Sequence, residues 1–316
     1  TSIAEAHSIF SNSVAAELAK LDPSNSLFVC PLQYHGRGSE PYISELGNRL
    51  DKNIDLMWTG RQICSEYLEV FDAAKFFEGT SKQPFYWDNY PVNDVAMVHQ
   101  LHVGPIQKRD ADLGKLARGL VANPMDRFES SLIPLATIAD YLWDSKNYDP
   151  DQSWNYAMDE LIPNRTDRDA IRRLFRNCFE SCLAVDAAPD FGALLGTVTL
   201  AWRTGQAHQA ARVLEEFAAE MFASHQTISA ADFSCPELRA EIGPWLAKYQ
   251  AVAEALTQIS TILKQTSFEK GRLTGTHQMA DQVRQIRISL AQDPTRIFGD
   301  GLDLVLGELA TELSAA

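Results

Sequence analysis

Four short apolar runs that alternate with helical patterns dominate the first half of the chain. The runs are Leu27–Cys30, Ile54–Trp58, Pro84–Trp87 and Gly119–Ala122. Their starts lie about 27, 30 and 35 residues apart, which leaves room for a crossover helix after each strand. The pattern therefore predicts consecutive βα units and a parallel sheet. Helices are expected near residues 1–20, 40–50, 66–77, 110–118 and 125–146.

The first helical pattern, AEAHSIFSNSVAAELAKL, has no strand before it. Four βα units are too few for an eight-stranded barrel, so residues 1–147 are predicted to form the second half of a (β/α)8 TIM barrel, strands five to eight. A half-barrel has an unpaired parallel strand at each edge and a core that is open on one side. We therefore expect it to need the N-terminal half of the barrel as a partner, in the same or a separate chain.

The second part of the chain, residues 148–316, is predicted to be an α-helical bundle domain. Stretches such as RDAIRRLFRNCFESCLAV and AVAEALTQISTILKQ have helical periodicity, and turn segments such as LIPNRT separate them. The amphipathic faces are compatible with packing on the barrel, with a homodimer, or with a groove for a glycosylated protein. Periodicity does not choose among these three.

Charge excludes several classes of partner. The chain has 42 acidic and 28 basic residues and a net charge of −14, which disfavours nucleic acid and anionic membrane surfaces. No apolar run approaches the ~20 residues of a membrane-spanning helix, and residues 1–20 resemble an amphipathic helix rather than a signal peptide. Five cysteines, an odd number, mildly favour a reducing compartment such as the cytoplasm, but export is left open.

No metal site or cofactor is expected. Cys178 and Cys182 are four residues apart on a predicted helix, but no further His or Cys completes a ligand set, so both are interpreted as small core residues. His99 and His102, in the long loop after the third run, are interpreted as surface residues.

Polar and aromatic side chains follow each of the four predicted strands. They are Tyr34, then Trp58 and Thr59, then Trp87, Asp88, Asn89 and Asp94, then Asn123. In a parallel barrel the carboxyl ends of the strands meet on one face. Aromatic rings pack on sugar faces and methyl groups, while Asn and Asp bind hydroxyls. The set therefore predicts a sugar pocket, although each residue alone is also compatible with turn chemistry, and Asn123-Pro124 with a helix start.

The segments that carry these residues resemble a known family. CPLQY, IDLMWTG, PFYWDNYPVND, LHVGPIQKR and LVANPMDRFES are similar, in order and spacing, to the signature segments of the O-GlcNAcase and hyaluronidase-type β-N-acetylglucosaminidases, glycoside hydrolase family 84. The resemblance covers about residues 1–146. It implies a (β/α)8 catalytic barrel followed by a helical domain.

The resemblance also implies a reaction. Family members remove β-linked N-acetylglucosamine from proteins or glycans with retention, using the substrate's own acetamido oxygen as the nucleophile and forming an oxazoline, instead of the carboxylate nucleophile of most retaining glycosidases. By motif, Asn89 would lie beside the acetamido group and Asp94 and Asn123 would bind sugar hydroxyls. Tyr34 and Trp87 would enclose the N-acetyl group, Tyr34 with a hydroxyl for catalytic support, and Thr59 would line the pocket.

The family's catalytic acid and base are two neighbouring aspartates at the end of the fourth barrel strand. The sequence has no Asp-Asp dipeptide. We therefore expect the pair N-terminal to residue 1, in a longer enzyme, and expect this chain to be inactive alone. The alternatives are a non-catalytic protein that binds N-acetylglucosamine and a helical interaction scaffold. Asp88 is interpreted as a structural residue at the strand's tip.

Overall fold

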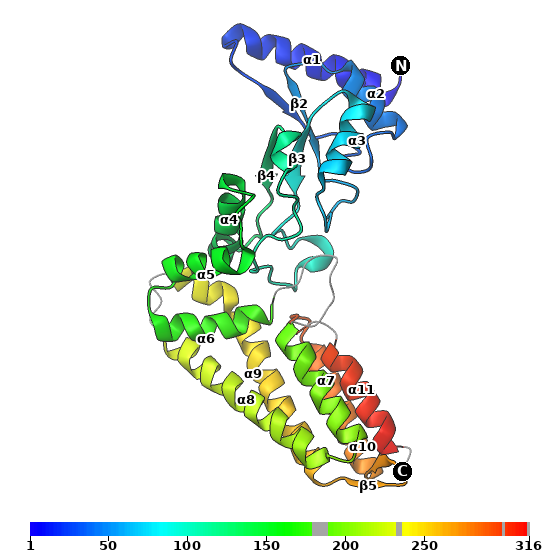
Figure 1. The fold of residues 1–316 in the computed structure, drawn as a ribbon, viewed down its shortest axis with the longest axis vertical. Helices are drawn as coiled ribbons and strands as arrows, with labels where there is room; N and C mark the ends of the chain where they lie inside the picture. The colour runs from blue at the N-terminus through cyan, green and yellow to red at the C-terminus, as the bar shows by residue number, and fades with distance from the viewer. Residues whose placement is uncertain (179–188, 232–235, 299–300, 315–316) are drawn as a thin grey trace. The chain divides into compact units, whose positions relative to one another are not determined.

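The computed structural model describes residues 1–178, 189–231, 236–298 and 301–314 (Figure 1). Two compact units interleave along the chain. The first contains Thr1–Val92, Pro105–Pro124 and Leu135–Ser153, and the second contains Asn93–Gly104, Met125–Pro134 and Trp154–Ala316. The division into residues 1–147 and 148–316 remains a prediction, because the units exchange segments on both sides of that boundary.

The first unit is built on a parallel sheet. Its elements are α1 (Ile3–Leu21), β1 (Leu27–Val29), α2 (Pro41–Arg49), β2 (Ile54–Trp58), α3 (Val70–Thr80), β3 (Pro84–Asp88), η2 (Leu113–Lys115) and β4 (Gly119–Ala122), with part of α4 (Phe128–Trp143). The strands pair in chain order, β1-β2-β3-β4, and all pairs are parallel. The predicted fold class, half of a TIM barrel followed by helices, is confirmed.

One predicted helix in this unit is wrong. Residues 110–118 form only the short 3-10 turn Leu113–Lys115. Local turn hydrogen bonds, such as that from the Leu113 amide to the Asp110 carbonyl at 3.0 Å, are joined by contacts to distant segments. Asp110 Oδ2 accepts from the Val70 amide at 3.3 Å, and the Asp110 carbonyl also accepts from the Tyr141 hydroxyl at 2.8 Å. These tertiary contacts replace the hydrogen bonds of a regular helix.

Helices cover one face of the sheet. Leu56, Trp58 and Tyr86 are fully buried on that face, and the Trp58 ring stacks on Phe76 of α3 with centroids 4.5 Å apart. Ile43 from α2 belongs to the same apolar cluster. The alternation of buried residues along β2 and β3 thus follows the period of two that a strand imposes.

The opposite face of the sheet is apolar and partly open. The strand register places Met57 beside Phe85 and Trp87 beside Val121. Phe28 and Val121 are 44% and 42% exposed, and the Phe28 ring packs on Phe85 at 4.5 Å. Parallel sheets are normally covered on both faces. Within the described residues, β1 and β4 each have one neighbouring strand, so both sheet edges are unpaired as well.

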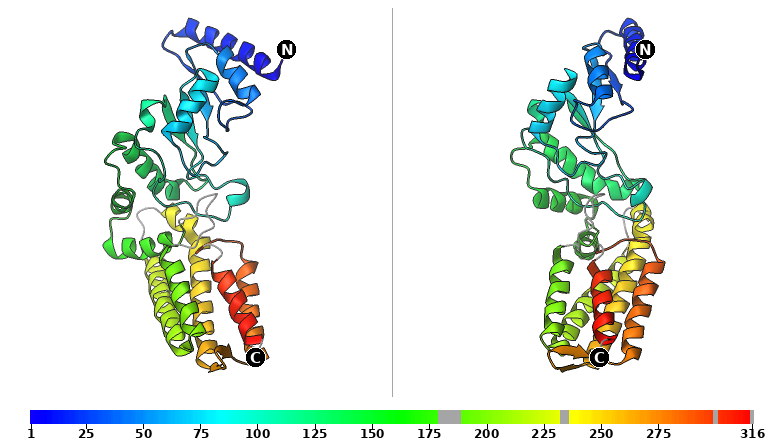
Figure 2. Two further views of the ribbon diagram at one scale, coloured as in Figure 1. Left: turned by 45° about the vertical axis from the view of Figure 1, so that its right-hand side comes forward. Right: turned by 90° about the vertical axis from the view of Figure 1, so that its right-hand side faces the viewer.

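The second unit is mainly helical. Its elements are η1 (Val95–Met97), most of α5 (Pro150–Leu161), α6 (Arg165–Arg176), α7 (Pro189–Arg203), α8 (Ala207–Ala230), α9 (Pro236–Lys264), β5 (Ser267–Glu269), β6 (Arg272–Thr274), α10 (His277–Gln292) and α11 (Gly301–Ser314). The long helices run side by side in both views of Figure 2. The antiparallel hairpin β5-β6 was not predicted. No helix in the described ranges combines the length and apolarity needed to cross a membrane.

The structure tests the predicted burial of the cysteines and the predicted exposure of the histidines. Cys178 is fully buried in the helical core, as predicted, whereas Cys182 lies outside the described residues. His99 is exposed, but the surface interpretation of His102 is wrong: it is 1% exposed, and its Nε2 lies 2.8 Å from Gln100 Oε1.

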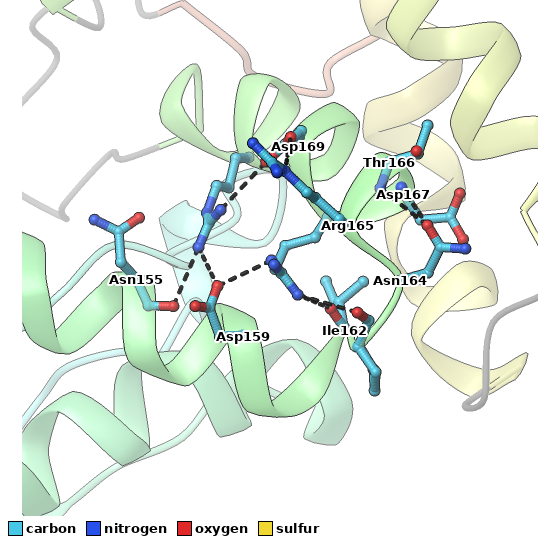
Figure 3. Close-up of polar contacts among 11 residues, drawn as sticks. Asn155, Asp159, Ile162, Asn164, Arg165, Thr166, Asp167 and Asp169 are labelled. Atoms are coloured by element: carbon cyan, nitrogen blue, oxygen red, sulfur yellow. Dashed lines mark hydrogen bonds and ion pairs between the residues drawn. The ribbon is translucent and has the colours of Figure 1, made fainter.

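Charged groups join α5 to α6. Asp159 on α5 forms an ion pair with Arg168, in which Nε lies 2.9 Å from Oδ1, and a second ion pair with Arg172 (Figure 3). The Asn164 side chain begins α6 by accepting from the amides of Thr166 and Asp167 at 2.9 and 3.2 Å. An Asn cap and a shared carboxylate together fix the turn between the two helices.

The Glu241 side chain caps the N-terminus of α4. Glu241 accepts hydrogen bonds from the Glu129 and Ser130 amides at 3.1 and 2.8 Å, and from the Ser130 hydroxyl at 2.8 Å. These donors belong to the first turn of α4, where a carboxylate is favourable. We expect Glu241→Ala to lower the free energy of unfolding by about 2 kcal/mol. Urea denaturation checks this, with the exposed Glu216→Ala as a control expected to stay within about 0.5 kcal/mol; equal effects would contradict it.

Candidate active site

The loops after β1 and β2 are tied together by their backbones. The Tyr34 carbonyl accepts from the Thr59 amide at 2.8 Å, and the Gly36 amide donates to the Gly60 carbonyl at 2.9 Å. The Trp58 indole donates to the Gly36 carbonyl at 3.1 Å. These bonds hold Tyr34, which follows β1, beside the carboxyl end of β2.

Glycine is required where these loops meet. Gly36 and Gly60 have φ values of +121° and +94°, and a Cβ on Gly60 would lie 2.4 Å from Ser65 Oγ. An L-residue is strained at such φ values. The glycine of the WTG segment therefore allows the tight turn after β2.

Thr59 is turned into this loop. Thr59 is 3% exposed. Its Oγ1 lies 2.7 Å from the Gln62 carbonyl and 3.3 Å from the Tyr34 carbonyl. Tyr34 is partly exposed, and its hydroxyl makes no hydrogen bond in the described part of the chain. The Tyr34 hydroxyl is thus available to a ligand, while the Thr59 hydroxyl is occupied.

Asn89 and Asn123 meet at the carboxyl ends of β3 and β4. Asn123 Nδ2 donates to Asn89 Oδ1 at 3.1 Å, and Asn89 Nδ2 donates to the Ile63 carbonyl at 2.7 Å. The Asn123 amide also donates to the Asp88 carbonyl at 2.9 Å. The alternative that Asn123-Pro124 begins a helix does not hold, because α4 begins at Phe128.

Trp87 lies on the open face of the sheet. It is partly exposed, and its Nε1 is buried without a hydrogen-bond partner among the described residues. A buried indole N–H normally finds an acceptor. This donor is therefore available to an acceptor that this part of the chain does not supply.

Asp88 is held in a buried ion pair. Arg109 Nε and Nη2 donate to its two carboxylate oxygens at 2.7 and 2.6 Å, and the side chains are 7% and 4% exposed. Burial alone lowers the pKa of Arg109, but the charge and hydrogen bonds of Asp88 outweigh it and the pKa is raised. Asp88 is thus engaged as an ion-pair partner, in agreement with its structural interpretation.

Arg109 also joins three segments. Its side chain donates to the carbonyls of Glu66 and Gln107 at 2.9 and 3.0 Å. Its backbone forms an isolated parallel β-bridge with Leu68. Arg109 lies in the LHVGPIQKR segment, but its sequence context did not indicate a role for it. The sequence shows an arginine in a long loop and an aspartate at a strand end, which is compatible with an ion pair. Their spacing, however, does not indicate that the two residues contact each other.

Asp94 belongs to the second unit, whereas the other predicted site residues belong to the first. It is exposed and precedes the 3-10 turn Val95–Met97, where its carbonyl accepts from the Met97 amide at 2.9 Å. The structure therefore brings Tyr34, Thr59, Trp87, Asn89 and Asn123 together at the carboxyl ends of the strands of the first unit.

The assembled groups are neutral amides, hydroxyls and aromatic rings. Such a set can bind hydroxyls and an acetamido group and can stack on a sugar ring. The described residues contain no group of three His, Cys, Asp or Glu arranged to hold a metal ion.

The chain is similar to known β-N-acetylglucosaminidases. Residues 1–176 match the family model of β-N-acetylglucosaminidase. Protein O-GlcNAcase of Rattus norvegicus and of Mus musculus are each 27% identical over 132 residues, which is 40% of this chain and 14% of theirs. This chain thus corresponds to a small part of the length of these relatives.

Solved structures match more of the chain. An O-GlcNAc hydrolase of Thermobaculum terrenum is 28% identical with a TM-score of 0.88, over 98% of this chain and 66% of that one. The structure of CpGH84B is 19% identical with a TM-score of 0.78, over 94% of this chain and 54% of that one, and shows the shared fold. Because the family model covers more than half of the chain, the chain belongs to the β-N-acetylglucosaminidases of glycoside hydrolase family 84.

Proposed function

We propose that this chain supplies one side of the sugar pocket of a retaining β-N-acetylglucosaminidase. The observation that carries the proposal is the meeting of Asn89 and Asn123 at neighbouring strand ends, beside Trp87 with its unpaired indole N–H. The amides would bind polar groups of the sugar, and Trp87 and Tyr34 would enclose its N-acetyl group.

The proposed reaction is substrate-assisted. The acetamido oxygen attacks the anomeric carbon as the bond from that carbon to the leaving oxygen breaks, while a general acid protonates the leaving oxygen and a base takes the proton of the acetamido N–H. The resulting oxazoline is opened by water with net retention. An amide oxygen attacks well only when it is held close to the anomeric carbon, so enclosure of the acetyl group contributes to turnover as well as to affinity. In this proposal Asn89 lies near the reacting centre, and Asn123 and Asp94 bind hydroxyls.

The catalytic carboxylates in this proposal come from outside this chain. Asp88 is paired with Arg109 and is therefore a poor general acid. The open face around Phe28, Phe85 and Val121 and the two unpaired sheet edges support completion by another set of βα units. A barrel completed in this way would place further strand ends opposite Asn89 and Asn123.

Hydrolysis of 4-nitrophenyl β-N-acetylglucosaminide tests the proposal. We expect the full-length gene product to release nitrophenol and this chain alone to release none, with NMR of the first product formed showing the β anomer. Addition of a separately expressed preceding segment to this chain should restore activity if the two halves associate. A full-length protein that binds N-acetylglucosamine without cleaving it would support the non-catalytic alternative, and an α product would exclude the retaining mechanism.

The proposed natural substrate is a protein or glycan that carries β-linked N-acetylglucosamine. The names of the rat and mouse relatives support a modified protein. Comparing kcat/KM for a glycosylated peptide and for a free chitin disaccharide distinguishes the two classes, because only the first would gain from contacts outside the sugar pocket.

A further inference from the structure

The short loop after β2 connects the two groups of residues in the proposed site. On one side, the Thr59 amide donates to the Tyr34 carbonyl at 2.8 Å. On the other side, the Ile63 carbonyl accepts from Asn89 Nδ2 at 2.7 Å. The conformation of this loop therefore affects both Tyr34 and Asn89.

The Thr59 hydroxyl closes the loop. A hydroxyl has one proton to donate, and the Gln62 carbonyl, at 2.7 Å, is closer to Oγ1 than the Tyr34 carbonyl, at 3.3 Å. Ser65 Oγ strengthens the same turn, because it accepts from the Gln62 amide and lies within hydrogen-bond distance of the Gln62 carbonyl, both at 3.1 Å. Ile63 directly follows Gln62, at which both contacts end, and lies within the turn that Ser65 closes.

The Ile63 carbonyl fixes the direction of the asparagine amides. A carbonyl can only accept, so it must face the Nδ2 group of Asn89, and Asn89 Oδ1 must then face Asn123 Nδ2. Asn123 consequently keeps its Oδ1 as a hydrogen-bond acceptor for a ligand. Without the carbonyl in this place, both amides are free to flip and to exchange donor for acceptor.

We propose that Thr59 is a positioning residue of this site, which acts through the Gln62 and Ile63 backbone on Asn89 and Asn123 and through its own amide on Tyr34. The inference rests on the proposed function and changes the predicted role of Thr59: its hydroxyl orients other groups, and contact between its methyl group and the sugar is not required.

Two substitutions in the full-length gene product separate these roles. Thr59→Val keeps the methyl group and the shape but loses the hydroxyl, whereas Thr59→Ser keeps the hydroxyl and loses the methyl. We expect Thr59→Val to lower kcat by about 10- to 100-fold with a smaller change in KM, because the reacting groups are misplaced. Thr59→Ser should stay within about threefold of the wild type.

Thr80→Val is the matched control. Thr80 is also fully buried in the first unit, and its hydroxyl donates to the Phe76 carbonyl at 2.7 Å, at the end of α3. The Thr80→Val substitution should lower the melting temperature about as much as Thr59→Val and leave kcat unchanged. Ser65→Ala tests the same loop without altering Thr59, and should lower kcat about threefold or more even if Thr59→Val fails to fold.

The outcomes are distinguishable. An active Thr59→Val enzyme with an impaired Thr59→Ser enzyme would show that the methyl group lines the pocket and would overturn the proposal. Unchanged kcat in both Thr59→Val and Ser65→Ala would also overturn it and leave the loop a purely structural role. A wild-type protein without glycosidase activity would instead contradict the proposed function itself.

Discussion

Replacing Arg109 with methionine is expected to lower the free energy of unfolding by about 3 to 5 kcal/mol. The substitution removes both hydrogen bonds to Asp88 and leaves a carboxylate buried without its counter-charge. It also removes the donors to the Glu66 and Gln107 carbonyls, so the segments around the strand end lose their common contact. Urea denaturation of the full-length gene product measures the change.

Arg287→Met provides a control with the same bidentate geometry in an exposed place. Arg287 donates to both oxygens of Asp303 at 2.5 and 2.6 Å, and these side chains are 45% and 48% exposed. Solvent screens such a pair, so a much smaller loss than at Arg109 is expected. The double variant Arg109→Met with Asp88→Asn should recover part of the stability, because no buried charge remains. Similar losses at Arg109 and Arg287 would contradict the structural role of the buried pair.

Replacing Asn89 with alanine is expected to lower kcat/KM for the nitrophenyl glycoside by about 100-fold. The substitution removes the hydrogen bond from Asn89 to the sugar that the proposed function assigns to it, and it removes the partner that fixes the Asn123 amide. Two such hydrogen bonds amount to about 2 to 3 kcal/mol, and each ~1.4 kcal/mol corresponds to a factor of ten in rate. Steady-state kinetics of the full-length gene product check this.

Asn53→Ala is the control for Asn89. Asn53 is exposed and directly precedes β2, at the opposite end of the strands from Asn89. Its replacement should leave kcat/KM unchanged. Normal kinetics for Asn89→Ala, with correct folding, would remove Asn89 and the amide pair from the proposed site.

Much of the first unit could be predicted from local patterns. The strand Ile54–Trp58 agrees with its predicted bounds, since alternating buried residues and the following Thr-Gly turn are local signals. The segment around residues 110–118 could not be predicted, because Asp110 bonds to Val70 and Tyr141, which are distant in the sequence. Its helical pattern was real but was overridden by tertiary contacts.

The candidate site shows the same division. Residue types at four strand ends were enough to indicate a sugar pocket, and the signature segments were enough to indicate the family. The buried state of His102 and the pairing of Arg109 with Asp88 had no local signal, because each depends on which loops meet in space.

The sequence by itself determined the order of strands and helices, the parallel sheet and the family, because periodicity and motif spacing are properties of neighbouring residues. Only the tertiary structure decided that Asp88 is engaged with Arg109, that the Thr59 hydroxyl is turned into its loop, and that the Ile63 carbonyl orients Asn89. Backbone carbonyls have no signature in a sequence, and the direction of a hydrogen bond depends on the atoms that the fold brings within about 3 Å of each other.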